Sequence, residues 1–319
     1  MQTAQSAAGQ DWYLIPKESL QKKEGERINS FMSWVGGKKA LRDEILPRFP
    51  LDYKRYIEVF GGGGWVLFHK TAGKDFEIYN DYNGDLVNLY RCVREHPREL
   101  KDELTFVLNA RLDFEYMKEV LQTKAVLPDV RRAAYFYALI RYSYASATDS
   151  FGGQPHAMWR NFPLITAAAK RLQTVVIENR DFQKLIQQHD RPESFFYCDP
   201  PYYKTESCYK GGGFGRQDHA RLAETLLGIS GKFLLSYNDC PEIEQLYTHP
   251  GIYIERVSRL SNIAQRYDPG CQYPELLISN YDTGERKRSI AQLSIFDSLE
   301  DTPQILLKER NMPYEEKCA

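Results

Sequence analysis

The chain has 319 residues, of which 42% are hydrophobic, 27% are charged and 13% are aromatic, and its formal net charge is −1. This composition is typical of a soluble globular protein, and the length suits one large domain with an insertion or two modest domains. A nearly neutral chain has no general attraction to nucleic acid, so any DNA contact must come from local basic patches.

The six cysteines lie far apart, and no two of them form a C-x-x-C pair. Metal-ligand spacing is therefore absent, and we expect no metal cofactor. Scattered thiols of this kind are typical of a reducing compartment. The N-terminal residues contain no apolar run long enough for a signal peptide or a membrane span, so we expect a cytoplasmic protein that does not bind membranes.

In chain order, residues 1–27 mix Gln, Lys, Glu and Ala without periodicity and are predicted to form a loose arm. Short apolar runs bounded by Gly, Asp, Asn or Pro then follow, which is typical of buried parallel strands. These runs are Tyr56–Phe60, Phe76–Tyr79, Val175–Glu178, Phe195–Cys198, Phe233–Tyr237 and Ile252–Glu255. Helical patterns such as Leu86–Arg94 and His219–Leu227 lie between most of them. Strand alternating with helix predicts a mostly parallel α/β sheet covered on both faces.

Residues 97–174 interrupt this alternation and are predicted to form an inserted lobe. Helical patterns over Glu99–Leu121 and Val130–Tyr142 precede a loop, Ser143–Pro163. From Arg131 onward the insertion holds six basic residues and one acidic residue, a local net charge of +5, with many Tyr and Phe side chains. Such a segment can neutralise phosphates and wedge between bases, although a solvated charged face with tyrosines in the core fits the same composition.

The strongest chemical signal is Asp199-Pro-Pro-Tyr202, directly after the apolar run that ends at Cys198. Proline cannot donate to a strand ladder, so a buried strand stops abruptly and presents a carboxylate, two carbonyls and an aromatic ring. Ligands of open α/β sheets bind at that edge. A strand-ending turn capped by Asp explains Asp-Pro alone, but it explains the full tetrapeptide poorly.

These groups suit methylation of an amino group on a planar base, because the lone pair of that nitrogen is delocalised into the ring. Hydrogen bonds from the amino group to the Asp199 carboxylate and the Pro200 carbonyl would favour a tetrahedral nitrogen with an available lone pair. Tyr202 would stack on the extracted base. The predicted catalytic residues are Asp199, Pro200, Pro201 and Tyr202.

Three weaker motifs precede this one. Glu58-Val-Phe-Gly-Gly-Gly-Gly64 ends the first predicted strand, where glycines let the backbone pass close under a ligand. It is not a dinucleotide fingerprint, because Val66 stands where the third glycine belongs. Asp81 ends the next strand, where a carboxylate suits paired ribose hydroxyls. Ser33-Trp-Val-Gly-Gly-Lys38 precedes the first strand. Taken singly, a flexible turn, a strand-end cap and a helix-leading loop explain these motifs.

Together, and in this order, the motifs resemble the Dam-like (D12) class of DNA adenine N6-methyltransferases, over residues 33–281. Trp34-Val-Gly-Gly-Lys38 is similar to the opening W-x-G-G-K of the family, Phe60-Gly-Gly-Gly-Gly64 to its F-x-G-x-G cofactor loop, and Asp199-Pro-Pro-Tyr202 to its catalytic motif. The resemblance implies a Rossmann-like sheet with a mainly helical DNA-recognition insertion. It also implies S-adenosylmethionine as methyl donor to a flipped-out adenine in double-stranded DNA.

The resemblance further implies binding residues. Asp81 would bind the cofactor's ribose, and Asp181 with Phe182 would hold its adenine. The full set of expected cofactor contacts is Trp34, Gly37, Lys38, Glu58, Phe60, Gly62, Gly64, Asp81, Asp181, Phe182 and Asp199. The segment that begins at Arg141 resembles the family's R-Y-x-Y segment, which opens a hairpin against the target. The expected DNA contacts are Arg141, Tyr142, Tyr144 and Arg160.

The chain departs from the family pattern at positions that read DNA. Members that methylate GATC usually have Lys before the Trp, where this chain has Ser33. They also have Asn and then a guanine-reading Arg after the second Tyr, where this chain has Ala145 and Asp149. A carboxylate cannot donate to guanine, although it could accept from cytosine N4. We therefore expect adenine methylation at a sequence other than GATC.

Residues 286–319 form a charged tail outside the expected sheet domain, which comprises 28–96 and 175–285. Gln292-Leu-Ser-Ile-Phe296 resembles the Q-L-S-L-F peptide with which bacterial proteins dock on the replication sliding clamp. Gln292, Leu293 and Phe296 would anchor this segment in a groove, and a tail strand packed on its own domain is the alternative.

Other functions fit parts of this pattern. An amino-methyltransferase could act on cytosine N4, on RNA or on a protein glutamine, and a degenerate methyltransferase fold could bind DNA without catalysis. The W-x-G-G-K opening favours DNA adenine, and the intact Asp199-Pro-Pro-Tyr202 favours catalysis. The recognition site, the oligomeric state and the biological role stay open; the role could lie in restriction–modification, in a phage or in replication-linked marking of bacterial DNA.

Overall fold

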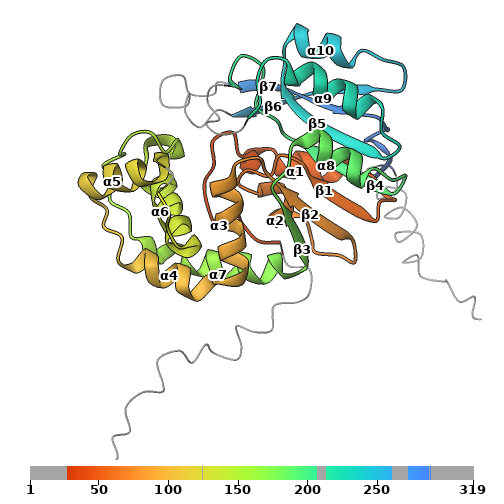
Figure 1. The fold of residues 1–319 in the computed structure, drawn as a ribbon. Helices are drawn as coiled ribbons and strands as arrows, with labels where there is room; N and C mark the ends of the chain where they lie inside the picture. The colour runs from red at the N-terminus through yellow and green to blue at the C-terminus, as the bar shows by residue number, and fades with distance from the viewer. Residues whose placement is uncertain (1–26, 124, 207–212, 261–271, 287, 289–319) are drawn as a thin grey trace, which may run out of the picture.

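The computed structural model describes residues 27–123, 125–206, 213–260, 272–286 and 288. Within these residues, seven strands form one sheet in the order β3-β2-β1-β4-β5-β7-β6 (Figure 1). The strands are β1 Arg55–Glu58, β2 Phe76–Asn80, β3 Val175–Glu178, β4 Ser194–Cys198, β5 Lys232–Asn238, β6 Tyr253–Leu260 and β7 Gln272–Ser279. The first five pair in parallel, whereas β7 runs antiparallel to both β5 and β6. The predicted mostly parallel α/β sheet is confirmed.

Helices cover both faces of the sheet. They are α1 Arg42–Ile45, α2 Trp65–His69, α3 Gly84–Glu95, α4 Pro97–Thr105, α5 Arg111–Gln122, α6 Asp129–Tyr142, α7 Phe162–Arg171, α8 Phe182–His189, α9 Asp218–Leu227 and α10 Pro241–Tyr247. Successive residues of a strand point to opposite faces, so Tyr56 and Ile57 of β1 belong to different hydrophobic clusters. The Ile57 cluster includes α8, α9 and α10, and the Tyr56 cluster includes α1, α2 and α3.

The six predicted strands correspond in place to β1 through β6, and β6 continues to Leu260 instead of ending at Glu255. The prediction missed β7. Its first three residues, Gln272 to Pro274, are exposed and break the apolar pattern, and only the second half is buried. β7 pairs with β5, and β5 pairs with β4, the strand that leads into the expected catalytic motif. Residues of β7 can therefore contribute to the site.

The inserted lobe is helical, as expected, but it differs from the prediction in two respects. The single helix expected over Glu99–Leu121 is two helices, because α4 ends at Thr105 and α5 begins at Arg111. At 3.6 residues per turn, one continuous helix would turn Phe114 roughly 80° away from the buried face of Leu104. The break lets both side chains reach the same core.

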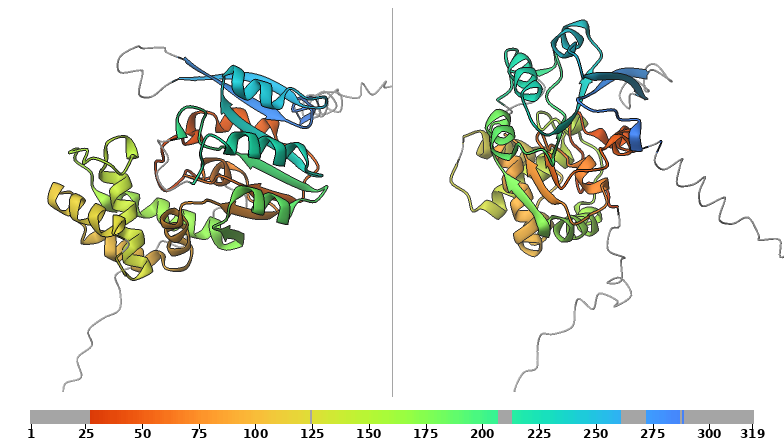
Figure 2. Two further views of the ribbon diagram at one scale, coloured as in Figure 1. Left: turned by 45° about the horizontal axis from the view of Figure 1, so that its top comes forward. Right: turned by 90° about the vertical axis from the view of Figure 1, so that its right-hand side faces the viewer.

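The lobe also shares its core with the sheet domain. The cluster that contains Leu104, Phe114 and Tyr137 of the lobe continues to Tyr56 and Tyr79 of the sheet. Figures 1 and 2 show α4, α5 and α6 standing beside the sheet, with α6 packed against α3. The loop after α6 lines the same pocket as the residues that follow β1, β2 and β4, so the lobe presents this loop toward the carboxyl ends of these strands.

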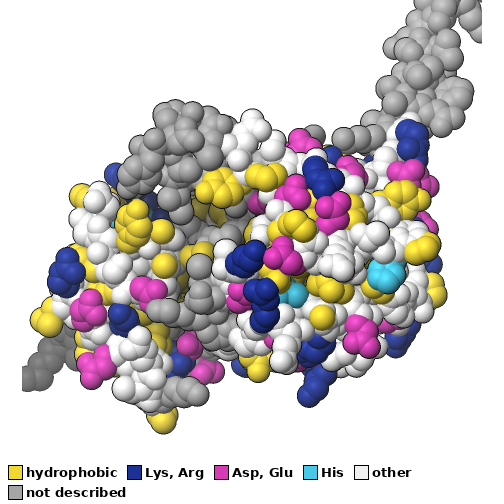
Figure 3. Space-filling view, turned by 90° about the horizontal axis from the view of Figure 1, so that it is seen from above, with side chains coloured by type: hydrophobic (Ala, Val, Ile, Leu, Met, Phe, Trp, Pro, Cys, Tyr) yellow, Lys and Arg dark blue, Asp and Glu magenta, His cyan; other side chains and the backbone are white. Residues whose placement is uncertain are grey.

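Half of the basic residues expected to give the insertion its positive charge form ion pairs with acidic residues of neighbouring elements. Arg131 and Arg132 form ion pairs with side chains of α4 and α3. Arg171 donates through two guanidinium nitrogens to Glu77 of β2, and the two side chains are 6% and 3% exposed. On the face of the molecule shown in Figure 3, basic and acidic side chains of the described residues are interspersed. Half of the basic residues that suggested a DNA-binding charge therefore serve the fold.

Glu77 is the centre of this buried charge network. Burial alone would raise the pKa of its carboxyl group, but hydrogen bonds and positive charge from Arg171 and Lys70 outweigh burial and hold the pKa below its ordinary value. Lys70 Nζ lies 2.9 Å from Glu77 Oε1.

The helices within the described part of the chain are all too short or too polar to span a membrane.

Replacing Arg171 with Met should lower the free energy of unfolding by about 3 kcal/mol, because a buried carboxylate then loses its bidentate partner. The control is Lys170→Met at the adjacent exposed residue, which should change stability by less than about 0.5 kcal/mol. Urea unfolding followed by circular dichroism measures both variants. Equal stability of the two would show that the Arg171–Glu77 bridge contributes little.

Candidate active site

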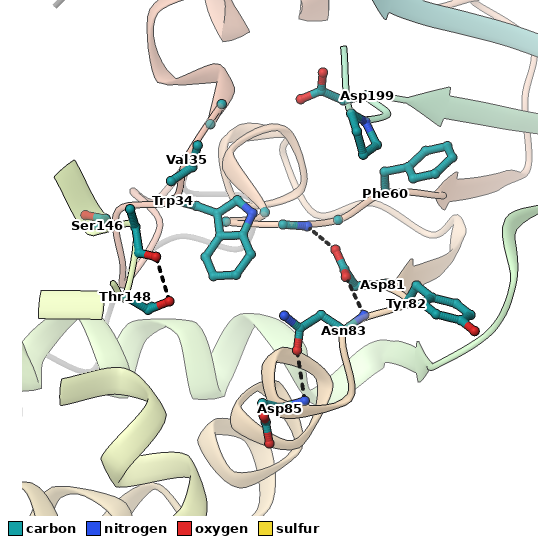
Figure 4. Close-up of a pocket in the computed structure, with 18 of the residues that line it drawn as sticks. Trp34, Val35, Phe60, Asp81, Tyr82, Asn83, Asp85, Ser146, Thr148 and Asp199 are labelled. Atoms are coloured by element: carbon teal, nitrogen blue, oxygen red, sulfur yellow. Dashed lines mark hydrogen bonds between the residues drawn. The ribbon is translucent and has the colours of Figure 1, made fainter. Parts of the chain in front are cut away.

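A pocket of about 320 Å³ lies at the carboxyl ends of the parallel strands, between the sheet and the lobe (Figure 4). The glycine loop after β1, Asp81 after β2 and Asp199 after β4 line one side. The opposite side comes from α5, α6 and residues 146–149 of the loop after α6. This position and size are those of small-molecule sites in open α/β folds.

Glycine is needed at two positions of the loop after β1 because of the loop's own conformation and packing. Gly62 and Gly64 have φ values of +49° and +62°, which L side chains rarely adopt. A Cβ atom on Gly62 would also lie 2.8 Å from the Trp34 ring, and one on Gly64 would lie 2.7 Å from the Tyr90 hydroxyl. Close approach to a ligand therefore explains only part of this loop; its backbone conformation and the surrounding aromatic rings explain the rest.

Asp81 is held against this loop by backbone donors. Its Oδ2 accepts a hydrogen bond from Gly62 N at 2.9 Å, and its Oδ1 accepts one from Asn83 N at 2.8 Å. Burial raises the pKa of the carboxyl group, and these donors offset part of that rise. Each oxygen keeps a lone pair, so ribose hydroxyls can still donate to it. Figure 4 shows the Trp34 indole and the Asp81 carboxylate pointing into the same space.

The opening motif and the catalytic motif meet in an ion pair. Lys38 Nζ lies 2.6 Å from Asp199 Oδ1, and the two side chains are 5% and 17% exposed. The same ammonium donates to Gly36 O at 3.1 Å and lies 4.7 Å from the centre of the Tyr202 ring. The structure thus brings Lys38 of the opening motif together with Asp199 and Tyr202 of the catalytic motif, which lie far apart in the sequence.

Glu58 lies at the end of β1 and lines the pocket, although its side chain is almost completely buried. The Tyr56 hydroxyl donates to Glu58 Oε2 at 2.7 Å. Burial raises the pKa of Glu58 to about 8, the hydrogen bond from Tyr56 lowers it in part, and the negative charge of Asp199 raises it further. Glu58 therefore carries a proton at neutral pH when the pocket holds no other positive charge.

Asp181 and Phe182 lie outside the main pocket. They line a smaller depression that shares Phe60 and Tyr82 with it, and the Phe60 and Phe182 rings are 5.6 Å apart. Asp181 caps α8, and its Oδ2 lies 2.8 Å from Arg221 Nη2. The other expected cofactor residues all line the main pocket.

The expected DNA contacts divide into two groups. Tyr144 is exposed, and the Arg160 guanidinium lies 5.6 Å from the ring of Trp159, an exposed aromatic residue that the sequence analysis missed. Tyr142 is placed differently from our expectation: its side chain is buried, because α6 continues to this residue and turns the ring into the core. Tyr142 therefore packs in the core, and Arg141, Tyr144 and Arg160 are the proposed DNA contacts.

The loop after α6 connects the lobe to the pocket. Its ends pair through a single bridge between Ser143 and Phe151. Within it, Ala145, Ser146 and Thr148 have φ values between 52° and 61°, a conformation that side chains other than glycine rarely adopt. Three positions at which the chain departs from the family pattern, Ser33, Ala145 and Asp149, meet here, because Ser33 Oγ lies 2.8 Å from Ser146 Oγ.

A parallel sheet with one antiparallel strand beside its last strand, a glycine loop after β1, a carboxylate after β2 and Asp-Pro-Pro-Tyr after β4 together define a Rossmann-like, S-adenosylmethionine-dependent methyltransferase. The sequence model of the D12 class N6 adenine-specific DNA methyltransferases matches residues 34–263. The chain belongs to this family, which confirms the predicted fold and DNA adenine methylation as its activity.

Relatives cover most of the chain at low identity. It is 25% identical over 288 residues to the Type II methyltransferase M1.LlaDCHI of Lactococcus lactis subsp. cremoris, which covers 82% of this chain and 99% of the relative. It is 28% identical over 284 residues to the DNA adenine methylase of Haemophilus influenzae, covering 82% and 96%. The DNA N-6-adenine-methyltransferase of Escherichia phage P1 is 28% identical over 263 residues, which are 75% of this chain and 34% of that protein.

Glu58→Gln should remove part of the pH dependence of stability. The unfolded glutamate ionises near pH 4.5 and the folded one near pH 8, so the folded state binds more protons between these values and rising pH favours unfolding. Between pH 5 and pH 7 the wild type should lose on the order of 3 kcal/mol relative to the variant. Urea unfolding at several pH values measures the difference, with Glu224→Gln on the exposed face of α9 as control. Parallel profiles would mean that Glu58 is ionised in the folded protein.

Proposed function

We propose that this chain transfers a methyl group from S-adenosylmethionine to N6 of an adenine flipped out of double-stranded DNA, at a specific sequence. The observation that carries the proposal is the position of Asp199. Its carboxylate ends β4, lines the pocket and lies beside Lys38 and the Tyr202 ring. An acceptor carboxylate and an aromatic ring therefore lie beside the same ammonium group where β4 ends, and Pro200, whose carbonyl the proposed chemistry uses, follows Asp199 directly in the chain.

The lining of the pocket suits the cofactor, which supplies a methyl group bound to a positively charged sulfur. Asp81 offers acceptors for two neighbouring hydroxyls, and Trp34 and Phe60 offer apolar surface. Glu58 and Asp199 place acidic groups beside the region where positive charge would lie. In the proposed complex Phe182 and Asp181 extend this site past Phe60, and the four residues of the glycine loop form its floor.

In the proposed mechanism the residues of the catalytic motif orient the amino group. Asp199 and the Pro200 carbonyl accept hydrogen bonds from its two N–H groups, which leaves the nitrogen lone pair available to attack the methyl carbon, whose bond to sulfur would break as the N–C bond forms. Pro201 keeps the backbone rigid, and Tyr202 stacks on the base. The N6 proton passes to Asp199 or to water. Because Lys38 occupies one oxygen of Asp199 in this structure, the arriving amino group must share or displace that ion pair.

We place the DNA on the side of the molecule where the lobe meets the sheet edge. Arg141 lies near Ser33 at the base of the loop after α6, and Tyr144 and Arg160 are exposed near it. Basic side chains there would contact phosphates, and exposed aromatic rings would contact bases. The bacterial and phage relatives support action on DNA in a bacterial cytoplasm.

Asp199→Ala should abolish methyl transfer while the fold survives, because it removes one of two acceptors for the amino group. The measurement is N6-methyladenine in plasmid DNA from a host without adenine methylation, by nucleoside mass spectrometry. Asp52→Ala, at a largely exposed carboxylate paired with Lys232, is the control and should keep wild-type activity. Full activity of Asp199→Ala would overturn the mechanism.

Sequencing of the same methylated plasmid identifies the recognition site. Ser33 and Asp149 stand where the GATC-reading members have Lys and Arg, and Asp149 lies in the loop that lines the pocket. A carboxylate accepts hydrogen bonds and cannot read guanine as Arg does. We therefore expect a recurrent methylated sequence other than GATC, and modification of GATC alone would contradict this expectation.

The clamp-binding proposal concerns Gln292, Leu293 and Phe296, which lie outside the described residues. Its support is the sequence of this segment, in which one polar residue, Ser294, separates the apolar anchor Leu293 from the second anchor, Ile295 with Phe296. Binding of the full chain to purified bacterial sliding clamp, measured by surface plasmon resonance, should fall at least about tenfold in Phe296→Ala, which loses an aromatic anchor. Unchanged binding in that variant would contradict the proposal.

A further inference from the structure

β7 contributes a buried carboxylate that none of the sequence motifs contains. Glu275 is 1% exposed, and its Oε2 accepts a hydrogen bond from the Tyr202 hydroxyl at 2.5 Å. Burial raises the pKa of Tyr202 well above its ordinary value, and the negative charges of Asp199 and Glu275 raise it further. The phenol therefore keeps its proton and remains the donor in this hydrogen bond.

β5, the strand next to β7, fixes the backbone of Tyr203, the residue that follows Tyr202. Asn238 of β5 is the register partner of Glu275. Its Oδ1 accepts a hydrogen bond from Tyr203 N at 3.1 Å, and its Nδ2 donates to Tyr203 O at 3.3 Å. One cross-strand pair, Asn238 with Glu275, thus fixes the Tyr202 side chain and the Tyr203 backbone directly after Asp-Pro-Pro.

This part of the chain needs such support. Lys204, the next residue, has a φ value of +69°, a left-handed conformation that non-glycine residues adopt only where their surroundings impose it. Thr205 N donates to Tyr202 O at 2.9 Å and closes a tight turn. The aromatic ring of the catalytic motif therefore stands at the start of an unfavourable turn, and its orientation depends on contacts from outside the motif.

We propose that Glu275 is a positioning residue for methyl transfer. By accepting a hydrogen bond from the Tyr202 hydroxyl, Glu275 fixes the position and orientation of the ring on which the target adenine would stack. Asn238 fixes the backbone of Tyr203, which follows. A hydrogen bond to a buried carboxylate is stronger than one between neutral groups, so it resists rotation of the ring when a base arrives. This inference rests on the proposed role of Tyr202 in binding the flipped base.

The test is a double-mutant cycle on Glu275 and Tyr202. Glu275→Leu and Tyr202→Phe should each lower kcat roughly 10- to 100-fold, because both release the ring, and small errors of placement are costly in catalysis. The double variant should be no slower than the slower single variant, since both changes remove the same bond. Glu275→Gln keeps an acceptor oxygen and should stay within several-fold of wild type.

The readouts are kcat at saturating plasmid DNA with tritiated S-adenosylmethionine, and cofactor affinity by calorimetry. Neither Glu275 nor Tyr202 lines the main pocket, so cofactor affinity should not change in any variant. Glu77→Gln is the matched control, because Glu77 is equally buried but lies at the far side of the fold in the Arg171 network. It should lower the melting temperature without lowering kcat, which separates a loss of stability from a loss of positioning.

Additive losses in the double variant, or full kcat in Glu275→Leu, would overturn the inference. If Glu275→Leu does not fold, Tyr202→Phe decides alone, because it removes only the hydroxyl, and full kcat there would also overturn it. Wild-type protein that makes no N6-methyladenine would instead overturn the proposed function. An active wild type with an unaffected Tyr202→Phe leaves that function standing and removes only the role of Glu275.

Discussion

The ion pair between Lys38 and Asp199 is the contact on which the arrangement of the site depends. Removing two charges from water costs free energy that their attraction offsets only when geometry and further partners are favourable. Here the ammonium also has Gly36 O and the face of the Tyr202 ring. The pair joins the loop before the first strand to the end of β4, and it thereby sets Trp34 against Gly62 at the pocket floor.

Acidic groups from three strands surround this contact. Glu58 ends β1, Asp199 follows β4 and Glu275 lies in β7, and all three raise the pKa of the buried Tyr197 between them, after the larger effect of burial. Burial, and to a smaller extent the negative charge of Asp199, raises the pKa of Glu58 to about 8, which favours its protonated form at neutral pH. An acidic site of this kind favours cations and amino groups and repels phosphate. This agrees with the proposed position of the DNA backbone on the lobe.

Local signals made the main features of this protein predictable from sequence. Asp-Pro-Pro-Tyr after an apolar run and four glycines after another are features of adjacent residues, and the parallel sheet follows from the same runs. Burial and pairing between distant residues were not predictable. The sequence suggested that Arg171 adds to a DNA-binding charge, but in the structure Arg171 forms a buried ion pair with Glu77. Tyr142 was expected to contact DNA, but its side chain is buried at the end of α6. Glu275 was not predicted as a site residue, because the exposed residues at the start of β7 break the apolar pattern of a strand. The only local signal for this strand was the apolar run from Leu276 to Ile278, directly after the acidic residue.

The loop after α6 links the region proposed to contact DNA with the main pocket. Ser146 is hydrogen-bonded to Ser33, which precedes Trp34, and Thr148 and Asp149 form part of the pocket wall. Residues in left-handed conformations hold the loop in a shape that is unfavourable by itself, so its contacts with the sheet domain must maintain it. In the proposed function, any movement of this loop on DNA would therefore move the Trp34 side of the main pocket. Under the proposed function, differences in sequence here would change the recognised site and the shape of the pocket together, and the departures from the family pattern at Ser33 and Asp149 lie in this region while Asp-Pro-Pro-Tyr stays intact.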